Sequence, residues 1–381
     1  MCRAVARDWE VPVERLDVSA FTIPTSSPEA DGTLAWNETT VVIVTAGAGG
    51  EVGLGYTYAD VATARLIECK LKRLVLHKSA VDVTAAWSEM VRAIRNLGRP
   101  GIASMGIAAV DNALWDLKAR LFQAPLVTLL GQVRESAPVY GSGGFTTYSA
   151  AELMCQLHGW VTQGIGAVKM KVGSHPEQDL DRVKTAREAI GPAVRLMVDA
   201  NGAYSRKQAL GLAEKFRDLG VSWFEEPVSS DDLEGLRLLR DRAPAEMEIA
   251  AGEYGYDAVY FRRMLEAGAV DVLQADATRC AGATGFLEAN SLCQAFGLPL
   301  SAHTAPSLHA HLCCAALRAR DVEYFHDHVR IEQMLFDGAA KAEQGVLKPD
   351  LSRPGFGLEL KHQDVERFRV YGNAAAQRSR N

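Results

Sequence analysis

Three acidic residues in the middle of the sequence each end or follow a short apolar run. They are Asp199, Glu225 and Glu253, which are 26 and 28 residues apart. That interval suits one strand and one crossover helix, so three successive parallel strands would place the carboxylates at one end of a sheet. Clustered carboxylates repel one another, and a hard divalent cation such as Mg²⁺ relieves the repulsion through oxygen ligands. The spacing therefore predicts a Mg²⁺ site, against the alternative of three unrelated surface acids.

Two lysines end the apolar run that precedes the first of these acids. Lys169 and Lys171 are two residues apart in Ala-Val-Lys-Met-Lys-Val, so on a strand both side chains point to the same side. Neighbouring ammonium groups lower each other's pKa, which leaves one of them closer to acting as a base. The pair is therefore a candidate for proton transfer, and a solvated surface pair is the alternative.

A carboxylate and an imidazole end two later runs, Gln-Ala-Asp at Asp276 and Ser-Ala-His at His303. Neighbouring strand ends can place a carboxylate on an imidazole nitrogen, which fixes the tautomer and raises the pKa, as a general acid or base requires. A lone structural histidine is the alternative. The sequence assigns no role to the other histidines of this region, which are His309, His311, His326 and His328.

The elements that must position these residues alternate between strand-like and helix-like runs from about residue 135 to 345. Strands are predicted at 138–143, 167–172, 195–200, 222–227, 248–253, 270–277, 298–303 and 322–326. Such an alternation predicts an α/β fold with a closed parallel sheet, a modified TIM-type (β/α)7β barrel, whose active site lies at the carboxyl ends of its strands.

Residues 1–134 lack this alternation. Two strand candidates, 39–44 and 51–58, flank a glycine-rich turn, and helical patterns follow them. The N-terminal part is therefore predicted to be an α+β capping domain, and the irregular tail, 346–381, is expected to return to it. The polar stretch from Phe21 to Asn37 is predicted to be a loop over the barrel mouth, because loops of this length are usually functional or disordered.

The composition excludes several classes of function. The chain has 381 residues, a net charge of −6, 48% hydrophobic and 23% charged residues, which is ordinary for a globular protein. The acidic balance argues against nucleic acid as a partner, and no apolar run has the length of a membrane span. The N-terminus lacks the apolar core of a signal peptide, and seven scattered cysteines fit a reducing compartment. We expect a cytoplasmic protein and a homo-oligomer.

Several short motifs occur together in one order. They are Lys-x-Lys, Asp-x-Asn, Glu-Glu-Pro, Ala-Gly-Glu, Asp-x-Thr-Arg-x-x-Gly-x-Thr and a later histidine. In this order and spacing the chain resembles the enolase superfamily, mandelate racemase subgroup, over nearly its whole length. The resemblance implies that Asp199, Glu225 and Glu253 bind Mg²⁺. It also implies that Lys171 is one base and that Lys169 is its electrostatic neighbour.

The same resemblance implies the remaining roles. His303 and Asp276 form a dyad, and an aspartate at 276 disfavours the muconate-lactonising branch, which has a lysine there. Glu323 on the eighth strand hydrogen-bonds the substrate carboxylate. Asn201 of Asp-x-Asn and Thr22 of the polar stretch are expected to bind substrate, a small-molecule carboxylate.

The implied reaction begins by removing the proton α to a carboxylate, as enzymes of this superfamily do with a Lys or His base and Mg²⁺. We favour dehydration of a sugar acid to a 2-keto-3-deoxy acid, because the polar stretch suits a polyol. The alternatives are a racemase or epimerase of a 2-hydroxy acid and a barrel that binds metal and ligand without turnover.

Overall fold

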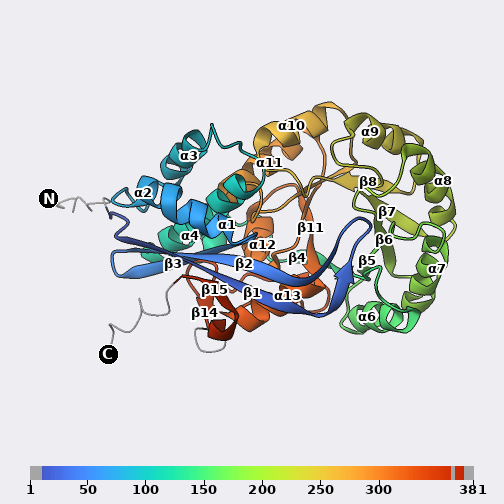
Figure 1. Cartoon of the computed structure of the whole chain (residues 1–381), viewed down its shortest axis with the longest axis horizontal. Helices are drawn as coiled ribbons and strands as arrows, with labels where there is room; N and C mark the ends of the chain where they lie inside the picture. The colour runs from blue at the N-terminus through green and yellow to red at the C-terminus, as the bar shows by residue number, and fades with distance from the viewer. Residues whose placement is uncertain (1–10, 362–364, 373–381) are drawn as a thin grey trace.

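The protein is described here as a computed structural model, which covers residues 11–361 and 365–372. The predicted ranges 1–134 and 346–381 therefore lie partly outside the described residues. Two units are visible in Figure 1, a barrel and a smaller domain built around a second sheet.

Eight parallel strands of the described chain form a closed barrel, because β11 pairs with β4 as well as with β10. The strands are β4 (Ala137–Gly143), β5 (Ala167–Lys171), β6 (Arg195–Asp199), β7 (Val221–Glu225), β8 (Glu248–Ala251), β9 (Val272–Ala275), β10 (Leu300–Ala302) and β11 (Ala319–Phe325). The connecting helices are α6 (Ala150–Thr162), α7 (Asp179–Ile190), α8 (Arg206–Arg217), α9 (Leu233–Arg242), α10 (Ala258–Glu266), α11 (Gly282–Phe296) and α12 (Pro306–Ala315). The predicted fold class is confirmed.

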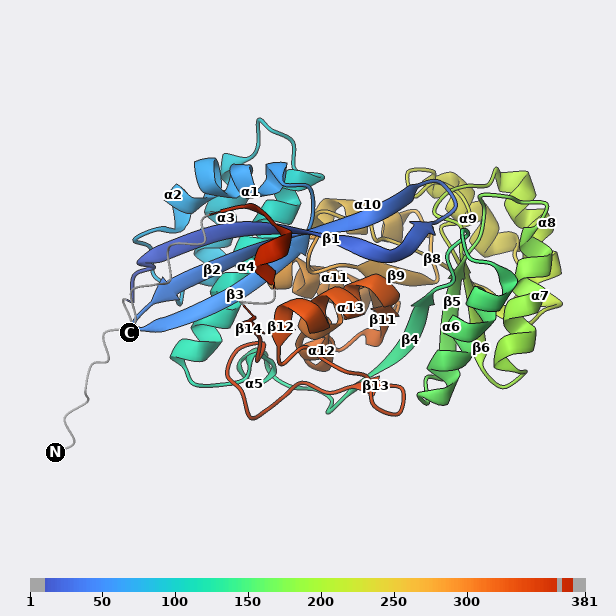
Figure 2. The same cartoon turned by 60° about the horizontal axis from the view of Figure 1, so that its bottom comes forward.

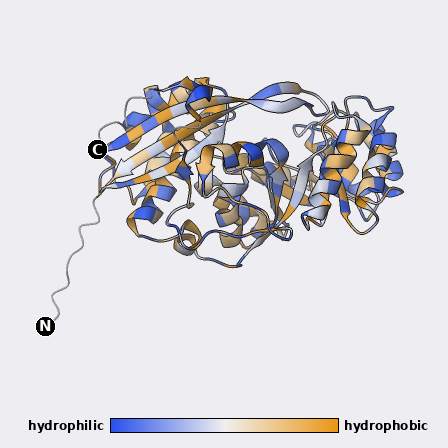
Figure 3. Cartoon of the chain, turned by 90° about the horizontal axis from the view of Figure 1, so that it is seen from below, coloured by the Kyte–Doolittle hydropathy of each residue, from blue (hydrophilic) through white to orange (hydrophobic). Residues whose placement is uncertain are grey.

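The helices around the barrel are amphipathic, as the alternating colours of Figure 3 show. In α8, for example, Ser205 caps the helix through a capping box with Gln208, and Ala209, Ala213 and Phe216 are buried. This spacing of three or four residues puts one apolar stripe against the sheet. The local sequence therefore fixes both where the helix begins and which face it buries.

The N-terminal domain carries an antiparallel sheet and a group of helices. Its strands are β1 (Arg15–Ala30), β2 (Ala35–Ala48) and β3 (Glu51–Tyr58). Its helices are α1 (Ala62–Leu66), a π-helical turn (Ile67–Leu71), α2 (Lys72–Val75), α3 (Val83–Ala93), α4 (Ile102–Leu121) and α5 (Leu126–Leu130). Of these, α4 packs against β3 and also against α11 of the barrel.

The prediction of a loop from Phe21 to Asn37 is wrong. β1 continues to Ala30 and β2 begins at Ala35, so most of this stretch is a two-stranded hairpin that reaches over the barrel (Figures 1 and 2). An irregularity between Pro24 and Glu29 interrupts the pairing, and polar residues dominate the extension (Figure 3). The polar composition and the interrupted pairing hide the alternation by which a strand is recognised in a sequence.

The chain after the barrel runs through α13 (His326–Leu335), β12 (Phe336–Asp337), β13 (Val346–Leu347), β14 (Glu359–Leu360), a 3₁₀ turn (Glu366–Phe368) and β15 (Arg369–Tyr371). First β13 pairs antiparallel with the start of β4. Later β15 pairs with β1 at the edge of the N-terminal sheet. The tail thus contacts the barrel and then the N-terminal sheet. No helix in the described part of the chain is long and apolar enough to cross a membrane.

The contact between β3 and α4 holds the sheet of the N-terminal domain against its longest helix, and it depends on two glycines. A Cβ at Gly55 would lie 2.3 Å from the carbonyl oxygen of Ala109, and one at Gly53 would lie 2.3 Å from that of Ala113. Small residues on both sides let the helix and the strand approach closely.

We expect Gly55→Ala to lower the free energy of unfolding by about 1–3 kcal/mol, because overpacking forces backbone shifts. Gly211→Ala is the control, since a Cβ there meets open space on α8, and alanine favours a helix by up to about 1 kcal/mol. Urea unfolding followed by circular dichroism measures both. Equal midpoints for Gly55→Ala and the unsubstituted protein would show that the contact is loose.

Candidate active site

The register of three adjacent strands brings the first predicted residues together. Lys171 on β5 is paired with Asp199 on β6, and Asp199 is paired with Glu225 on β7. All three side chains are buried. They face the barrel interior because residues two apart on a strand share a side, and Trp223, two residues before Glu225, belongs to the inner apolar layer.

The third acid, Glu253, lies just beyond the end of β8. Gly252 makes this position possible, because its φ is 135° and a Cβ there would lie 2.2 Å from the carbonyl oxygen of Gln274. Only glycine adopts this conformation readily and fits this close approach. The turn brings Glu253 toward Asp199 and Glu225, and one carboxylate oxygen from each lies within 4.8 Å of the others.

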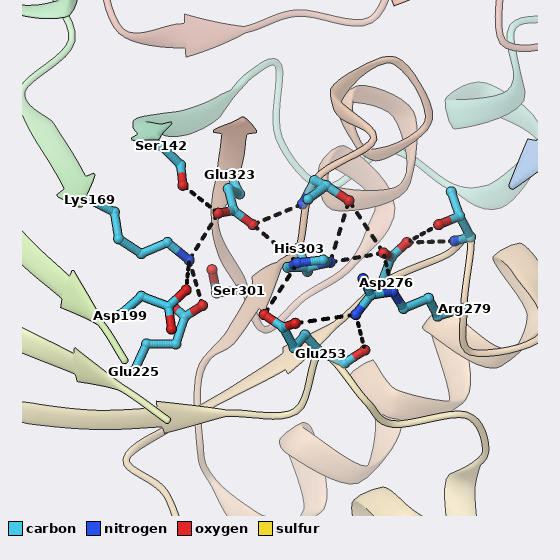
Figure 4. A network of polar contacts seen from close by, with 12 residues as sticks. Ser142, Lys169, Asp199, Glu225, Glu253, Asp276, Arg279, Ser301, His303 and Glu323 are labelled. Carbon is cyan, nitrogen blue, oxygen red and sulfur yellow. Dashed lines mark hydrogen bonds and ion pairs between the residues drawn. The ribbon is translucent and has the colours of Figure 1, made fainter. Parts of the chain in front are cut away.

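Two lysines supply positive charge to this cluster, and Figure 4 shows the first of them, Lys169. Lys169 Nζ lies 2.5 Å from Glu225 Oε1, 2.9 Å from Glu323 Oε1 and 3.7 Å from Asp199 Oδ2. Lys171 Nζ lies 2.5 Å from Asp199 Oδ2. The two lysines are expected to lower each other's pKa, but the carboxylates around them have a larger effect in the opposite direction. Burial lowers both pKa values, but the carboxylates, led by Glu225 for Lys169 and by Asp199 for Lys171, raise them above the ordinary value.

The three carboxylates fit a hard divalent cation. All the candidate ligand atoms are carboxylate oxygens, which suits Mg²⁺. Glu253 Oε2 is buried and has no hydrogen-bond partner among the described residues. Burial is the larger cause, and the negative charge of Asp199 the second, of a rise in the pKa of Glu225 to about 8. Repulsion between buried carboxylates is relieved by a cation.

His303 and Asp276 lie at the ends of neighbouring strands, as predicted. His303 Nδ1 is 2.9 Å from Asp276 Oδ2, and Asp276 Oδ1 accepts hydrogen bonds from the backbone and hydroxyl of Thr278. His303 Nε2 faces Glu253 Oε2 at 3.3 Å and Glu323 Oε2 at 3.6 Å. Burial lowers the pKa of His303, but Glu253, Glu323 and the hydrogen bond to Asp276 together outweigh it and raise the pKa to about 9.

Glu323 lies between Lys169 and His303 (Figure 4). Its Oε1 lies 2.9 Å from Lys169 Nζ and accepts a 2.6 Å hydrogen bond from Ser142. Its Oε2 accepts from the backbone of Thr304 and faces His303. Burial raises its pKa, but Lys169 and then His303 lower it to about 2.

These groups surround a cavity of about 420 Å³ between the barrel and the N-terminal domain. Of the predicted residues, those that line it are Lys171, Asn201, Glu253, His303 and Glu323. Asn201 has φ 47°, and its Oδ1 is buried without a partner among the described residues. Thr22 does not line the cavity, and its hydroxyl hydrogen-bonds Thr40 at 2.8 Å within the sheet. The hairpin and β3 contribute Asp31, Leu34, Trp36, Glu38, Thr39, Thr40, Tyr58, Ala59 and Asp60 instead.

Two residues that line the cavity, Arg279 and His328, were assigned no role from the sequence. Arg279 Nη1 lies 3.3 Å from Glu253 Oε1, and its guanidinium stands over the Tyr254 ring. The arginine was visible inside the Asp-x-Thr-Arg motif, although no role was given to it. His328 also lines the cavity. No motif contains it, so only the fold of the chain after β11 reveals it.

Two known protein families match this chain. Residues 152–365 match the family described as enolase C-terminal domain-like, and residues 19–131 match the mandelate racemase / muconate lactonizing enzyme N-terminal domain. The chain belongs to the enolase superfamily. Both matches and the motifs indicate the mandelate racemase subgroup, which confirms the resemblance seen in the sequence.

Relatives of this superfamily member are enzymes. Arabinonate dehydratase of Saccharolobus solfataricus is 30% identical over 83% of this chain and 86% of its own length. A mandelate racemase/muconate lactonizing enzyme-like protein from Rubrobacter xylanophilus is 53% identical, with a TM-score of 0.92 over 94% of this chain and 100% of its own. The L-talarate/galactarate dehydratase of Salmonella typhimurium, solved with Mg and L-lyxarohydroxamate, is 26% identical, with a TM-score of 0.87 over 98% of this chain and 97% of its own.

We expect Glu225→Gln to weaken Mg²⁺ binding at least about tenfold, because even residues outside the ligand set typically change metal affinity by 10- to 100-fold. Titration calorimetry of chelator-treated protein measures the dissociation constant. Glu188→Gln, which changes an exposed carboxylate on α7, should leave it unchanged. An unaltered constant in Glu225→Gln would remove this residue from the ligand set.

Proposed function

We propose that this enzyme is a Mg²⁺-dependent dehydratase that converts a sugar acid to a 2-keto-3-deoxy acid. The observation that carries the proposal is that two separate proton-transfer groups lie beside one cluster of carboxylates. Lys171 reaches the cavity from β5, and the His303–Asp276 dyad reaches it from β10 and β9. Dehydratases of sugar acids among the relatives support the same choice.

Asp199, Glu225 and Glu253 would hold the cation. When bound, Mg²⁺ would supply positive charge to the substrate carboxylate, whose α-proton is otherwise too weakly acidic to remove. Asn201 is placed to meet the substrate, because it lines the cavity and its side-chain oxygen has no partner among the described residues.

Lys171 and His303 divide the proton transfers. Their strands are separated in the barrel by β11 and β4 on one side and by β6 to β9 on the other, so they approach the cavity from different directions. One of them removes the α-proton, and the other protonates the departing β-hydroxyl, which is a poor leaving group without that proton. Asp276 keeps the imidazole in the tautomer whose Nε2 faces the cavity.

Glu323 faces the substrate, and Lys169 acts through it. Glu323 lines the cavity, whereas Lys169 does not and is bonded to Glu225 and Glu323. To donate a hydrogen bond to the substrate carboxylate, Glu323 must be protonated. A second carboxylate beside it raises its pKa, so the arriving substrate favours the form that can donate.

A racemase or epimerase of a 2-hydroxy acid is the second candidate, and the same two groups support it. In that reaction each group would serve one face of the α-carbon, with no leaving group to protonate. The two reactions differ in what happens to the β-hydroxyl, which an assay detects directly.

We also propose a cytoplasmic location and assembly into a homo-oligomer. A reducing compartment is supported by the free thiols of the described cysteines, which are Cys69, Cys155, Cys280, Cys293, Cys313 and Cys314. No nucleic acid or membrane partner is part of the proposal.

A panel of sugar acids, assayed for 2-keto acid formation, tests the proposed function. We expect turnover of at least one member with Mg²⁺, its loss with EDTA, and its return when Mg²⁺ is added in excess. Product formation that persists in EDTA would contradict the metal dependence. Inversion of configuration without 2-keto acid would select the racemase instead.

The division of labour is tested by following the α-proton in D₂O by NMR. If Lys171 is the abstracting base, His303→Asn should stop dehydration yet still exchange the α-proton, because abstraction survives while the hydroxyl cannot leave. Lys171→Ala should then stop both processes. The reverse pattern would make His303 the base, and turnover near that of the unsubstituted enzyme in both variants would refute the two-group assignment.

A further inference from the structure

The charged groups of the active-site cavity are unevenly distributed. Among the described residues that line it, the lysine and arginine side chains are Lys171 and Arg279. Both are at the catalytic end, where Lys171 contacts Asp199 and Arg279 contacts Glu253. The lysine and the arginine of the cavity therefore both lie at the end where the reacting carboxylate must bind.

The wall that the N-terminal domain contributes is acidic and hydroxylated, and we call it the cap wall. Its charged members are Asp31, Glu38 and Asp60, and its hydroxyl groups belong to Thr39, Thr40 and Tyr58. No lysine or arginine is among the described residues of this wall.

An arginine of α13 does not change this balance. Arg330 donates to Asp327 Oδ1 from both Nε and Nη2, and it donates to the carbonyl oxygen of Pro24. It does not line the cavity. Its charge is thus matched by Asp327, whose other oxygen accepts a hydrogen bond from Thr39.

Beside the cap wall, the barrel contributes an imidazole that is uncharged. His328 stacks on Tyr58, with ring centroids 3.5 Å apart and an interplanar angle of 14°. Its Nδ1 is buried without a hydrogen-bond partner among the described residues. Burial lowers the pKa of His328 to about 3, so the ring offers hydrogen bonds and no positive charge.

We infer that the substrate is a monocarboxylate sugar acid, an aldonate, whose end remote from the reacting carboxylate is uncharged and hydroxylated. This inference rests on the proposed function. A dicarboxylate would bring its second carboxylate to Glu38 and Asp60 with no cation to meet it, which disfavours binding. Terminal hydroxyls, in contrast, find acceptors in the carboxylates of Glu38 and Asp60 and a partner in His328. The hydroxyls of Thr39, Thr40 and Tyr58 are already bonded to Asp327, Thr22 and Glu332.

The test compares five- and six-carbon aldonates with the aldarates that share their configuration at every chiral carbon, for example gluconate with glucarate and galactonate with galactarate. We expect kcat/KM for the best aldonate to exceed that of its matched aldarate at least about tenfold, because a site built for hydroxyls rejects an unpaired charge. An aldarate turned over equally well or better would overturn the inference and leave the dehydratase proposal standing. Absence of dehydration across both sets would overturn both.

A charge reversal on the cap wall makes the test specific to this surface. Glu38→Lys should shift the aldonate-to-aldarate ratio toward the aldarate by about fivefold, chiefly through KM, because an exposed charge pair is worth up to about 1 kcal/mol. Glu14→Lys is the control, with the same change of charge on an exposed residue of the same domain away from the cavity. Equal shifts in both variants, or none in Glu38→Lys, would show that the cap wall does not meet the remote end.

His328→Phe tests the uncharged partner separately, because phenylalanine keeps a ring that can stack on Tyr58. We expect KM for the preferred aldonate to rise about fivefold with a smaller change in kcat, as a lost hydrogen bond predicts. An unchanged KM would remove His328 from the substrate contacts and contradict that part of the inference.

Discussion

Burial of several carboxylates at one end of the barrel is the constraint on which the rest of this structure depends. Asp199, Glu225, Glu253, Asp276 and Glu323 are all nearly inaccessible to solvent. Burying a charge is unfavourable unless it is paired and hydrogen-bonded, so the barrel must supply counter-charges from other strands. It does so with two lysines from β5, an imidazole after β10 and an arginine after β9. The site therefore depends on residues that several strands of the closed sheet bring together.

The same constraint explains why the N-terminal domain is fixed to the barrel by polar contacts as well as by packing. Asn112 on α4 donates to the carbonyl oxygen of Ala277 and accepts from the backbone of Ala283. Asp111 accepts from Thr284, and Thr57 donates to the carbonyl oxygen of Thr278. These bonds hold the loop that carries Asp276 and Arg279. The position of the dyad therefore depends on the domain that covers it.

The sequence revealed the barrel and most of the site because successive parallel strands lie side by side. Residues at their carboxyl ends are therefore close in space. Acids that end successive strands must meet, and the motifs that contain them are continuous in sequence. The hairpin over the mouth could not be recognised, since its residues are largely polar and its pairing is interrupted between Pro24 and Glu29, which hides the alternation that identifies a strand. Thr22 was misplaced for that reason. The raised pKa of Lys171 was also hidden, because it depends on carboxylates from other strands outnumbering one neighbouring lysine.

Chemistry and substrate choice come from different parts of this chain. The groups that move protons are attached to barrel strands or to the turns that follow them, whereas the opposite wall comes largely from a hairpin and the end of β3. Glu38 and Thr40 of the hairpin line the cavity and make no hydrogen bond or ion pair with the described carboxylate cluster or its lysines. The surface that meets the remote part of a ligand can therefore change at such positions while the reaction is retained. Substitutions in the buried cluster are less easily tolerated, because losing one charge leaves another buried charge unpaired. Dehydratases named for different sugar acids, one matched by sequence and one by structure, are what this separation of roles predicts.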